Sequence, residues 1–233
     1  MRPLGGRVPN GILRAAALGP RVPDKAQRTT LSDADLIAVG SHGTTRAYPK
    51  HTIIVSEGDR TDSLYVILEG RVKAFVSDEH GNEMVLSTQG PGEYFGEMVL
   101  DEGPRSASIM TLEPSRFLVV PKKDFREFIA SNPAFAQSLI DKLIGRVRVL
   151  TENVKSLALM DVYGRVARLL LELAEEKDGM LLIAQRLTQQ EIASRIGASR
   201  EMVSRILKDL ATGGYLTQSR SGIVLHRKPP EHW

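Results

Sequence analysis

The chain has 233 residues, of which 42% are hydrophobic and 25% are charged, an ordinary composition for a globular protein with a buried core. No apolar run approaches the ~20 residues that cross a bilayer, so an integral membrane protein is excluded and a cytoplasmic location is expected. The chain contains no cysteine, which excludes disulfides, thiol catalysis and cysteine-ligated iron–sulfur or zinc sites.

The net charge of +3 is unevenly distributed along the chain. Residues 31–161 carry 14 basic and 19 acidic side chains, whereas residues 162–233 carry 11 basic and eight acidic ones. An acidic middle followed by a basic C-terminal part is typical of a sensor joined to a nucleic-acid-binding module, although a random split also gives differences of this size.

Residues 1–30 are rich in Gly, Pro and Arg and are expected to form a flexible tail. Residues 31–132 are then predicted to form a sensor domain with an antiparallel β-roll. Its short β-like runs are separated by turns such as His80-Gly81-Asn82, a pattern that predicts a sandwich or barrel. The expected strands are Ile53–Val55, Leu64–Leu68, Val72–Val76, Met84–Leu86 and Phe117–Val120.

Residues 133–160 are predicted to form a long dimerisation helix. Apolar residues alternate by three and four, with β-branched residues at one heptad position and leucine at the other. This pattern favours a parallel two-stranded coiled coil, and the alternative is a helix that packs on its own domain. Lys142 and Arg146 are expected on its outer faces. The predicted seam comprises Ile140, Leu143, Val147, Leu150, Val154 and Leu157.

Residues 161–233 are predicted to form a winged helix-turn-helix, which makes the whole chain α+β. Thr188 and Glu191 have the spacing of a capping box, so a helix begins there, and Gly197 permits the turn that ends it. Ser199 can cap a second helix, and two β-like segments follow that helix. Two short helices joined by a Gly turn indicate an element whose second helix enters the DNA major groove.

The second of these helices carries charged residues on the face opposite its apolar stripe. Arg200, Glu201 and Arg205 span about 140° of the helix. Arginine pairs bidentately with guanine, and a carboxylate accepts from the N4 amine of cytosine. The alternative is a solvated surface cluster, but the position on a recognition helix favours DNA contact. The predicted DNA-binding residues are Thr188, Gln189, Ser199, Arg200, Glu201, Ser204 and Arg205.

Together these features resemble the CRP/FNR family of transcription regulators, from about Leu31 to Lys228. The resemblance rests on three motifs. They are Glu57-Gly58-Asp59 followed by Leu64–Gly70, Gly96-Glu97-Met98 followed by Pro104–Ala107, and Ser199–Arg205. It implies a homodimeric, allosteric regulator that binds palindromic double-stranded DNA with GTGA-like half-sites. RNA polymerase is an implied partner, through the loop from Glu176 to Gln185 and the sensor surface.

The resemblance also implies a cyclic nucleotide effector, with cyclic AMP as the first choice. In such members backbone N–H groups and an arginine hold the cyclic phosphate, which Arg105 would do here, and Glu97 would accept from the ribose hydroxyl. The alternative is a plain ion pair between Glu97 and Arg105. The implied ligand-binding residues are Gly96, Glu97, Met98, Arg105, Ser106, Ala107, Leu150 and Thr151.

Two positions of the long helix depart from the family's cyclic-AMP receptors. Where those receptors place a Thr-Ser pair against adenine, this chain has Leu150 and Thr151. Leu150 cannot bond the exocyclic amine, and an unpaired buried donor costs about 1–3 kcal/mol. Another cyclic nucleotide, a cyclic dinucleotide, and a ligand-independent regulator with a degenerate pocket therefore remain alternatives.

No residue pattern indicates catalysis or a bound metal. A Ser–His–Asp arrangement and paired catalytic carboxylates do not stand out, and the histidines lack metal-ligand spacing. His80, the candidate haem ligand, is expected in a turn. We therefore expect a regulator without a resident cofactor rather than an enzyme that uses the β-roll pocket.

Overall fold

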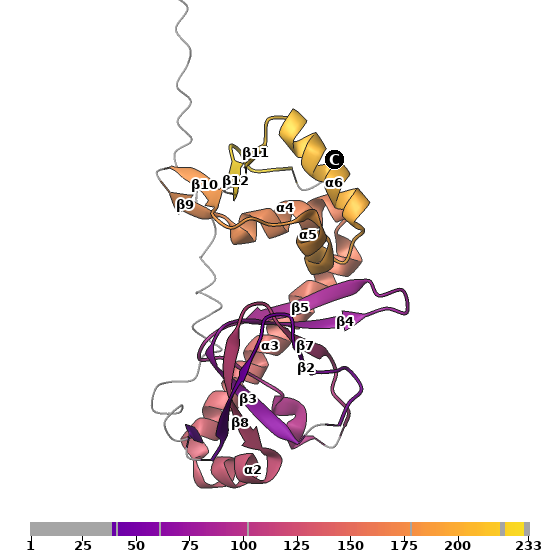
Figure 1. The fold of residues 1–233 in the computed structure, drawn as a ribbon. Coiled ribbons are helices and arrows are strands. Elements are labelled where there is room, and N and C mark those ends of the chain that lie inside the picture. The colour runs from indigo at the N-terminus through magenta and orange to yellow at the C-terminus, as the bar shows by residue number, and fades with distance from the viewer. Residues whose placement is uncertain are drawn as a thin grey trace, which may run out of the picture.

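The computed structural model describes residues 39–40, 42–60, 62–101, 103–177, 179–219 and 222–230. These residues form a β-rich sensor and a C-terminal helical unit, joined by the long helix α3, Pro133–Leu159 (Figure 1). The tail predicted for residues 1–30 lies outside the described residues. No helix in the described ranges is both long and apolar enough to cross a membrane.

The described sensor is built from two four-stranded antiparallel sheets, in the orders β1-β8-β3-β6 and β2-β7-β4-β5. Phe95 and Phe117 from the first sheet share a buried cluster with Val72 and Ile109 from the second, so the sheets enclose a common core. The strands are β1 Thr44–Tyr48, β2 Ile53–Val55, β3 Ser63–Glu69, β4 Val72–Ser77, β5 Glu83–Gln89, β6 Tyr94–Phe95, β7 Ser108–Thr111 and β8 Ser115–Pro121.

The five strands expected from the sequence are confirmed, but β1, β6 and β7 were not predicted. β1 is an edge strand whose first four residues are exposed, so it lacks the apolar alternation by which a half-buried strand is recognised. β6 has only two residues, which gives no periodicity at all. β7 directly follows the Pro104–Ala107 motif, and its four residues are too few for the alternation of buried and half-buried positions to mark a strand.

A second core joins the sensor to the helices. α2, Lys122–Ser131, buries Phe125 and Phe128, and the first turns of α3 bury Phe135 and Leu139. The rings of Phe128 and Phe135 meet edge to face with centroids 4.9 Å apart. These side chains pack on the apolar residues of β3 and β8, so the first part of α3 is fixed to its own sensor.

The rest of α3 leaves an apolar stripe exposed. Five of the six predicted seam residues are exposed, from 37% for Leu157 to 65% for Val154. Leu143 instead packs against the sensor core, and Ile144, which is 46% exposed, takes its place in the stripe. The outer-face prediction is wrong for Lys142, which is only 6% exposed, and for Arg146, which turns toward the sensor. The heptad pattern misses this because the sensor covers a second face of the helix.

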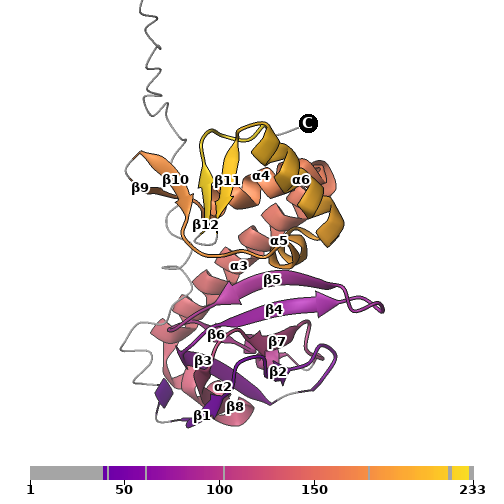
Figure 2. The same cartoon turned by 45° about the horizontal axis from the view of Figure 1, so that its top comes forward.

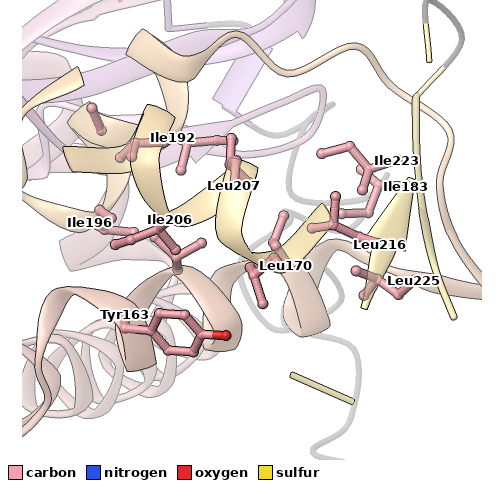
Figure 3. Close-up of a cluster of buried hydrophobic side chains, with 14 residues drawn as sticks. Tyr163, Leu170, Ile183, Ile192, Ile196, Ile206, Leu207, Leu216, Ile223 and Leu225 are labelled. Carbon is pink, nitrogen blue, oxygen red and sulfur yellow. The ribbon is translucent and has the colours of Figure 1, made fainter. Parts of the chain in front are cut away.

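In its described residues, the C-terminal unit combines three helices with a four-stranded sheet in the order β11-β12-β10-β9. Figure 3 shows its core, in which Leu170 of α4, Ile192 of α5 and Leu207 of α6 point toward one another, with Leu225 of β12 at one side. The elements are α4 Val162–Leu173, β9 Glu175–Lys177, β10 Met180–Ile183, α5 Gln189–Ile196, α6 Arg200–Thr212, β11 Leu216–Ser219 and β12 Gly222–Leu225.

The segment from Glu176 to Gln185, expected to be a loop, largely forms the hairpin β9–β10. β10 also pairs with β12, so the hairpin extends the sheet that contains the predicted wing. The polar sequence of β9 (Glu-Glu-Lys) hides this strand, because its three residues are all exposed and lie at the edge of the sheet.

The cap of α5 gives a direct test of this local structure. The Thr188 Oγ1 accepts from the Glu191 N–H at 3.1 Å, and the Glu191 Oε2 accepts from the Thr188 N–H at 2.7 Å. Thr188→Ala should lower the free energy of unfolding by about 1 kcal/mol, the usual cost of losing an N-cap. Urea denaturation of the full chain measures this, with Thr212→Ala, at an exposed position, as a control expected to show no loss.

Candidate functional site

A tight turn before the short helix η2, Glu97–Leu100, forms one wall of the predicted ligand site. Gly96 has φ 83°, a left-handed conformation that favours glycine. A Cβ at this position would lie 2.9 Å from the Ser63 carbonyl oxygen and 3.1 Å from Arg105 Nη1. Glycine is therefore required both by the backbone conformation and by the close approach of the Ser63 carbonyl.

Arg105 is the buried cation of this site, with only 6% of its surface exposed. Its Nη1 donates to the Gly96 carbonyl at 2.9 Å and its Nη2 donates to the Ser63 carbonyl at 2.8 Å. The Nε has no hydrogen-bond partner. Burial lowers the pKa of Arg105, while Tyr65, Glu97 and Asp62 act in the opposite direction.

Within the described ranges, Arg105 forms no ion pair with a carboxylate. A guanidinium stays protonated in proteins, and a buried charge is normally paired with an opposite one. The two carbonyls satisfy part of its hydrogen-bonding capacity but supply no countercharge. The site is therefore suited to an anion.

Glu97 pairs with the long helix rather than with Arg105. Its Oε1 lies 2.8 Å from Arg146 Nη1, and Arg146 Nη2 donates to the Tyr94 carbonyl at 2.6 Å. The guanidinium also lies over the Tyr94 ring, 4.9 Å from its centroid. The expected alternative of a Glu97–Arg105 ion pair is thus wrong. Arg146 was missed as a site residue because its position in the heptad pattern assigned it to solvent.

The other predicted ligand residues fall into two groups. Ser106 Oγ donates to Met98 Sδ at 3.0 Å, which joins the two motifs around Gly96 and Arg105, and Ala107 is half-buried beside Ser106. Leu150 and Thr151 are exposed on α3, one turn beyond Arg146. The Thr151 hydroxyl donates to the Val147 carbonyl at 2.9 Å, so its oxygen remains available as an acceptor.

The helix-turn-helix is confirmed together with its caps. Gly197 ends α5 in the left-handed conformation, with φ 63°, and the Ser199 Oγ accepts from the Met202 N–H at 3.2 Å to begin α6. α6 buries an apolar stripe, of which Val203 and Leu210 are fully covered. The turn and both helix starts are therefore local structures that the sequence alone specifies.

Arg200, Glu201 and Arg205 are exposed on α6, as predicted. Arg200 Nε lies 3.5 Å from Glu201 Oε1. A hydrogen bond from its own backbone N–H, helped by Arg200, holds the pKa of Glu201 below its usual value. The carboxylate is therefore an acceptor near neutral pH. Ser204 is half-buried on α6, and Gln189 is half-buried in the first turn of α5.

The geometry does not suggest a metal site. In the part of the chain that the structure describes, no three His, Asp or Glu side chains are grouped so that they could hold a metal ion. His80 lies exposed in the turn between β4 and β5.

Two segments of the chain match known domain families. Residues 45–132 match the cyclic nucleotide-binding domain, and residues 164–229 match the Crp-like helix-turn-helix domain. The first match covers the turn at Gly96 and Arg105, and the second covers α5 and α6.

Individual relatives agree with the two matches. The chain is 34% identical over 183 residues to a CRP-like cAMP-activated global transcriptional regulator of Mycobacterium tuberculosis, covering 76% of this chain and 82% of that protein. It is 35% identical over 191 residues to the cAMP-activated global transcriptional regulator CRP of Salmonella typhimurium, covering 80% and 91%.

A solved structure extends the likeness to three dimensions. The c-di-GMP responsive global regulator CLP of Xanthomonas campestris superposes with a TM-score of 0.74 at 27% identity, covering 84% of this chain and all of that one. These relatives are transcription regulators and not enzymes. The chain belongs to the CRP/FNR family of transcription regulators.

Proposed function

We propose that this regulator is switched by a cyclic nucleotide bound at Arg105, with cyclic AMP as the first candidate. The observation that carries the proposal is the buried Arg105 guanidinium, which has neutral carbonyl partners and a free Nε but no countercharge in the described chain. A cyclic phosphate supplies a single negative charge and acceptor oxygens, which is what such a cation lacks. Gly96, Met98, Ser106 and Ala107 would form the surrounding turn.

The ribose and base would be read by the long helix. Glu97 can accept from a ribose hydroxyl, and the Thr151 oxygen can accept from an exocyclic amine. Leu150 offers only an apolar contact. Relatives of this chain are activated by cyclic AMP in two cases and respond to cyclic di-GMP in another, so the base contacts on α3 would decide among nucleotides.

A substitution at Leu150 tests that assignment. Leu150→Thr should tighten cyclic AMP binding about tenfold, because it provides an acceptor for the second N–H of the exocyclic amine, and a donor buried without a partner costs about 1–3 kcal/mol. Isothermal titration calorimetry measures the change, and Leu159→Thr, at another exposed leucine of α3, is the matched control. Unchanged affinity in Leu150→Thr would place the base elsewhere.

We propose that the exposed stripe of α3 is the dimer interface. Ile140, Ile144, Val147, Leu150 and Val154 are all between 46% and 65% exposed, and an apolar surface of this kind on a coiled-coil pattern is stabilised by a second copy. The domains would then be a tail (1–30), a sensor (31–132), a dimerisation helix (133–160) and a winged helix-turn-helix (161–233).

Val154→Asp should break the dimer, because it buries an unpaired carboxylate in the seam. Lys155→Asp introduces the same residue at the next position, on a face away from the stripe, and should leave the dimer intact. Sedimentation velocity reads the outcome against the 25.6 kDa of one chain. A Val154→Asp variant that stays at twice this mass would contradict the assignment.

In the dimer, two copies of α6 would lie in successive major grooves of a palindromic site with GTGA-like half-sites. Arg200, Glu201 and Arg205 would contact the bases, with Thr188, Gln189, Ser199 and Ser204 near the backbone. RNA polymerase would contact the sensor surface and the exposed hairpin β9–β10. The protein would act in the cytoplasm, where DNA and nucleotides meet.

The Glu97–Arg146 pair would couple the ligand to the dimer helix. A nucleotide that engages Glu97 competes with Arg146, which also holds the Tyr94 carbonyl, so binding changes the forces on α3. A helix shared by two subunits and followed directly by α4 can transmit this change to the DNA-binding units.

Calorimetric titration of the full chain with cyclic AMP, cyclic GMP and cyclic di-GMP tests the proposal. We expect one of the three nucleotides to bind with a stoichiometry of one per sensor, and cyclic AMP is the first candidate. If none binds, the regulator is ligand-independent with a degenerate pocket, and the proposal is wrong.

A further inference from the structure

The DNA-binding unit is docked directly on its own sensor. α5 lies against β5 in both views of the fold (Figures 1 and 2). A Cβ at Gly197, in the turn between α5 and α6, would lie 3.4 Å from Leu157 Cδ2 and 3.7 Å from Met84 Sδ. The turn of the helix-turn-helix therefore packs on β5 and on the end of α3.

A small cavity of about 70 Å³ lies in this seam between the two units. It is bounded by β5, the end of α3, α4 and α5. Its polar lining comprises Asn153, Ser156, Arg165, Arg168, Glu172 and Arg195.

The cavity is strongly basic. Arg168 pairs with Glu172 at 3.0 Å, which leaves Arg165 and Arg195 as the remaining charged groups of the lining. The buried Nε of Arg165 has no hydrogen-bond partner, and no ion pair of either guanidinium is present within the described ranges. Two arginines thus share one half-open space, and neither forms an ion pair within the described ranges.

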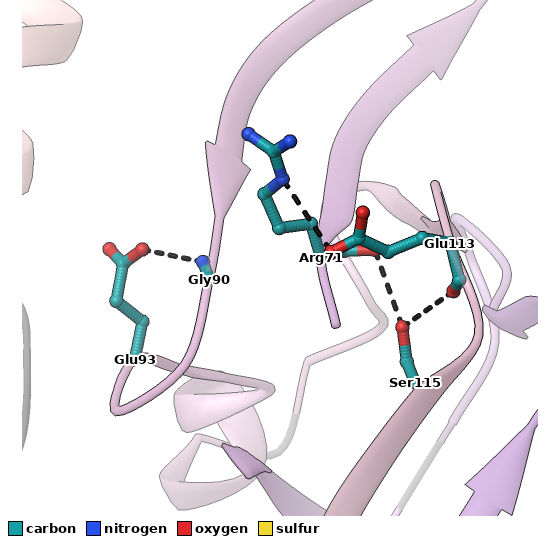
Figure 4. Close-up of polar contacts among 5 residues, drawn as sticks. All are labelled: Arg71, Gly90, Glu93, Glu113 and Ser115. Carbon is teal, nitrogen blue, oxygen red and sulfur yellow. Dashed lines mark hydrogen bonds and ion pairs between the residues drawn. The ribbon is translucent and has the colours of Figure 1, made fainter. Parts of the chain in front are cut away.

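A third arginine adds to this positive charge from the sensor side. Arg71, between β3 and β4, is close enough to Arg195 to lower the pKa of Arg195, in addition to the larger effect of burial; Glu191 acts in the opposite direction. The Arg71 Nε lies 3.7 Å from Glu113 Oε1, a long ion pair between exposed groups (Figure 4). Like charges across a seam oppose docking of the two units.

We propose that this cavity is a binding site for a phosphate group, held by Arg165 and Arg195. A tetrahedral oxyanion supplies the missing countercharge and acceptors for the arginine forks. The size fits, because about 70 Å³ exceeds the ~30 Å³ share of one water molecule, yet falls far short of the roughly 300–1,000 Å³ of pockets that enclose drug-sized ligands. Asn153 can donate to the same anion, and so can Ser156 if its hydroxyl turns away from Met160 Sδ, to which it donates at 3.4 Å.

The consequence is a second input, separate from Arg105. An anion that bridges α4 and α5 beside β5 stabilises the arrangement in which the turn at Gly197 rests on Met84 and Leu157. If the DNA-binding unit leaves this position, the bridge is lost. Phosphate would therefore shift the equilibrium toward the docked arrangement.

Thermal unfolding of the full chain, with inorganic phosphate replacing chloride at constant ionic strength, tests the site. We expect the midpoint of the wild-type protein to rise by about 2 °C or more at saturation. The rise should be lost in Arg165→Gln/Arg195→Gln and partly kept in Arg165→Lys/Arg195→Lys. It should remain in Arg105→Gln, which removes the cation of the sensor site.

A second arm uses 5′-AMP at the same concentrations to distinguish free phosphate from the phosphate group of a nucleotide. A rise that depends on Arg165 and Arg195 supports the site in either arm, and the stronger response identifies the source. No rise in the wild-type protein, a rise that the double Gln variant keeps in full, or one that Arg105→Gln abolishes would overturn the proposal. Only the last of these results would point to the sensor site.

Discussion

Arg205→Ala should weaken binding of the dimer to a palindromic GTGA-containing duplex by roughly 2–6 kcal/mol, since each half-site loses a bidentate contact worth about 1–3 kcal/mol. Arg205 is exposed on α6, on the face opposite the stripe that includes Val203 and Leu210. Its removal should leave the fold intact because the side chain takes no part in the core. Fluorescence anisotropy at fixed salt measures the loss.

The type of loss distinguishes base reading from phosphate contact. If Arg205 reads guanine, Arg205→Ala should bind duplexes changed at that one base pair almost as well as the GTGA duplex, whereas loss of a phosphate contact weakens all sequences equally. Arg116→Ala, on β8 of the sensor, is the matched control and should change nothing. A uniform loss over all duplexes would assign Arg205 to the DNA backbone.

Arg105→Leu should abolish the response to the cyclic nucleotide. Truncating one partner of a buried, hydrogen-bonded charge pair costs about 2–5 kcal/mol, which corresponds to a loss of roughly 30-fold to several thousand-fold in nucleotide affinity. Arg105 is 6% exposed, so water cannot replace the lost contacts easily. Calorimetry measures nucleotide affinity, and anisotropy measures whether the nucleotide still changes DNA binding.

Two further variants separate a lost binding site from a damaged sensor. Arg105→Lys keeps the charge but not the fork that reaches both the Gly96 and Ser63 carbonyls, so intermediate affinity is expected. Arg116→Leu makes the same change at an exposed arginine and should bind normally. If Arg105→Leu retains full affinity for the nucleotide, Arg105 does not hold the phosphate.

The helix-turn-helix was the part of the molecule most fully predicted from sequence. Its signals are local: a capping box at Thr188 and Glu191, a left-handed Gly197, and a cap at Ser199. Each depends on residues within one helical turn, and no distant contact is needed to form it. The exposed face with Arg200 and Arg205 then follows from helical periodicity alone.

The sheets were predicted in outline, and the strands that were missed are edge strands or very short ones. Strands that contain a clear apolar run were found, whereas the edge strands β1 and β9 present mainly polar, exposed residues and give no such signal. β7 lies inside its sheet and was missed because its buried and half-buried residues alternate over only four positions. Membership of a sheet is decided by pairing with distant strands, such as β1 with β8 and β9 with β10. Sequence periodicity does not report these partners.

The contacts of α3 show the same limit within the candidate site. A heptad pattern identifies one apolar face, and in the described chain this face is indeed exposed. It does not reveal that Leu143 and Lys142 are covered by the sensor, or that Arg146 pairs with Glu97. The contacts of Arg146 with the sensor join residues about 50 positions apart in the sequence, and only the folded sensor brings these residues together.

We propose that nucleotide binding at Arg105 controls DNA binding by α6. The most direct test is anisotropy titration of a labelled palindromic GTGA duplex at fixed salt, without ligand and with cyclic AMP, cyclic GMP and cyclic di-GMP in turn. We predict that one nucleotide, cyclic AMP first, tightens binding tenfold or more, which is about 1.4 kcal/mol of coupling. Tight binding that is indifferent to all three would contradict the claim, and would identify a regulator whose sensor serves only to hold the dimer together.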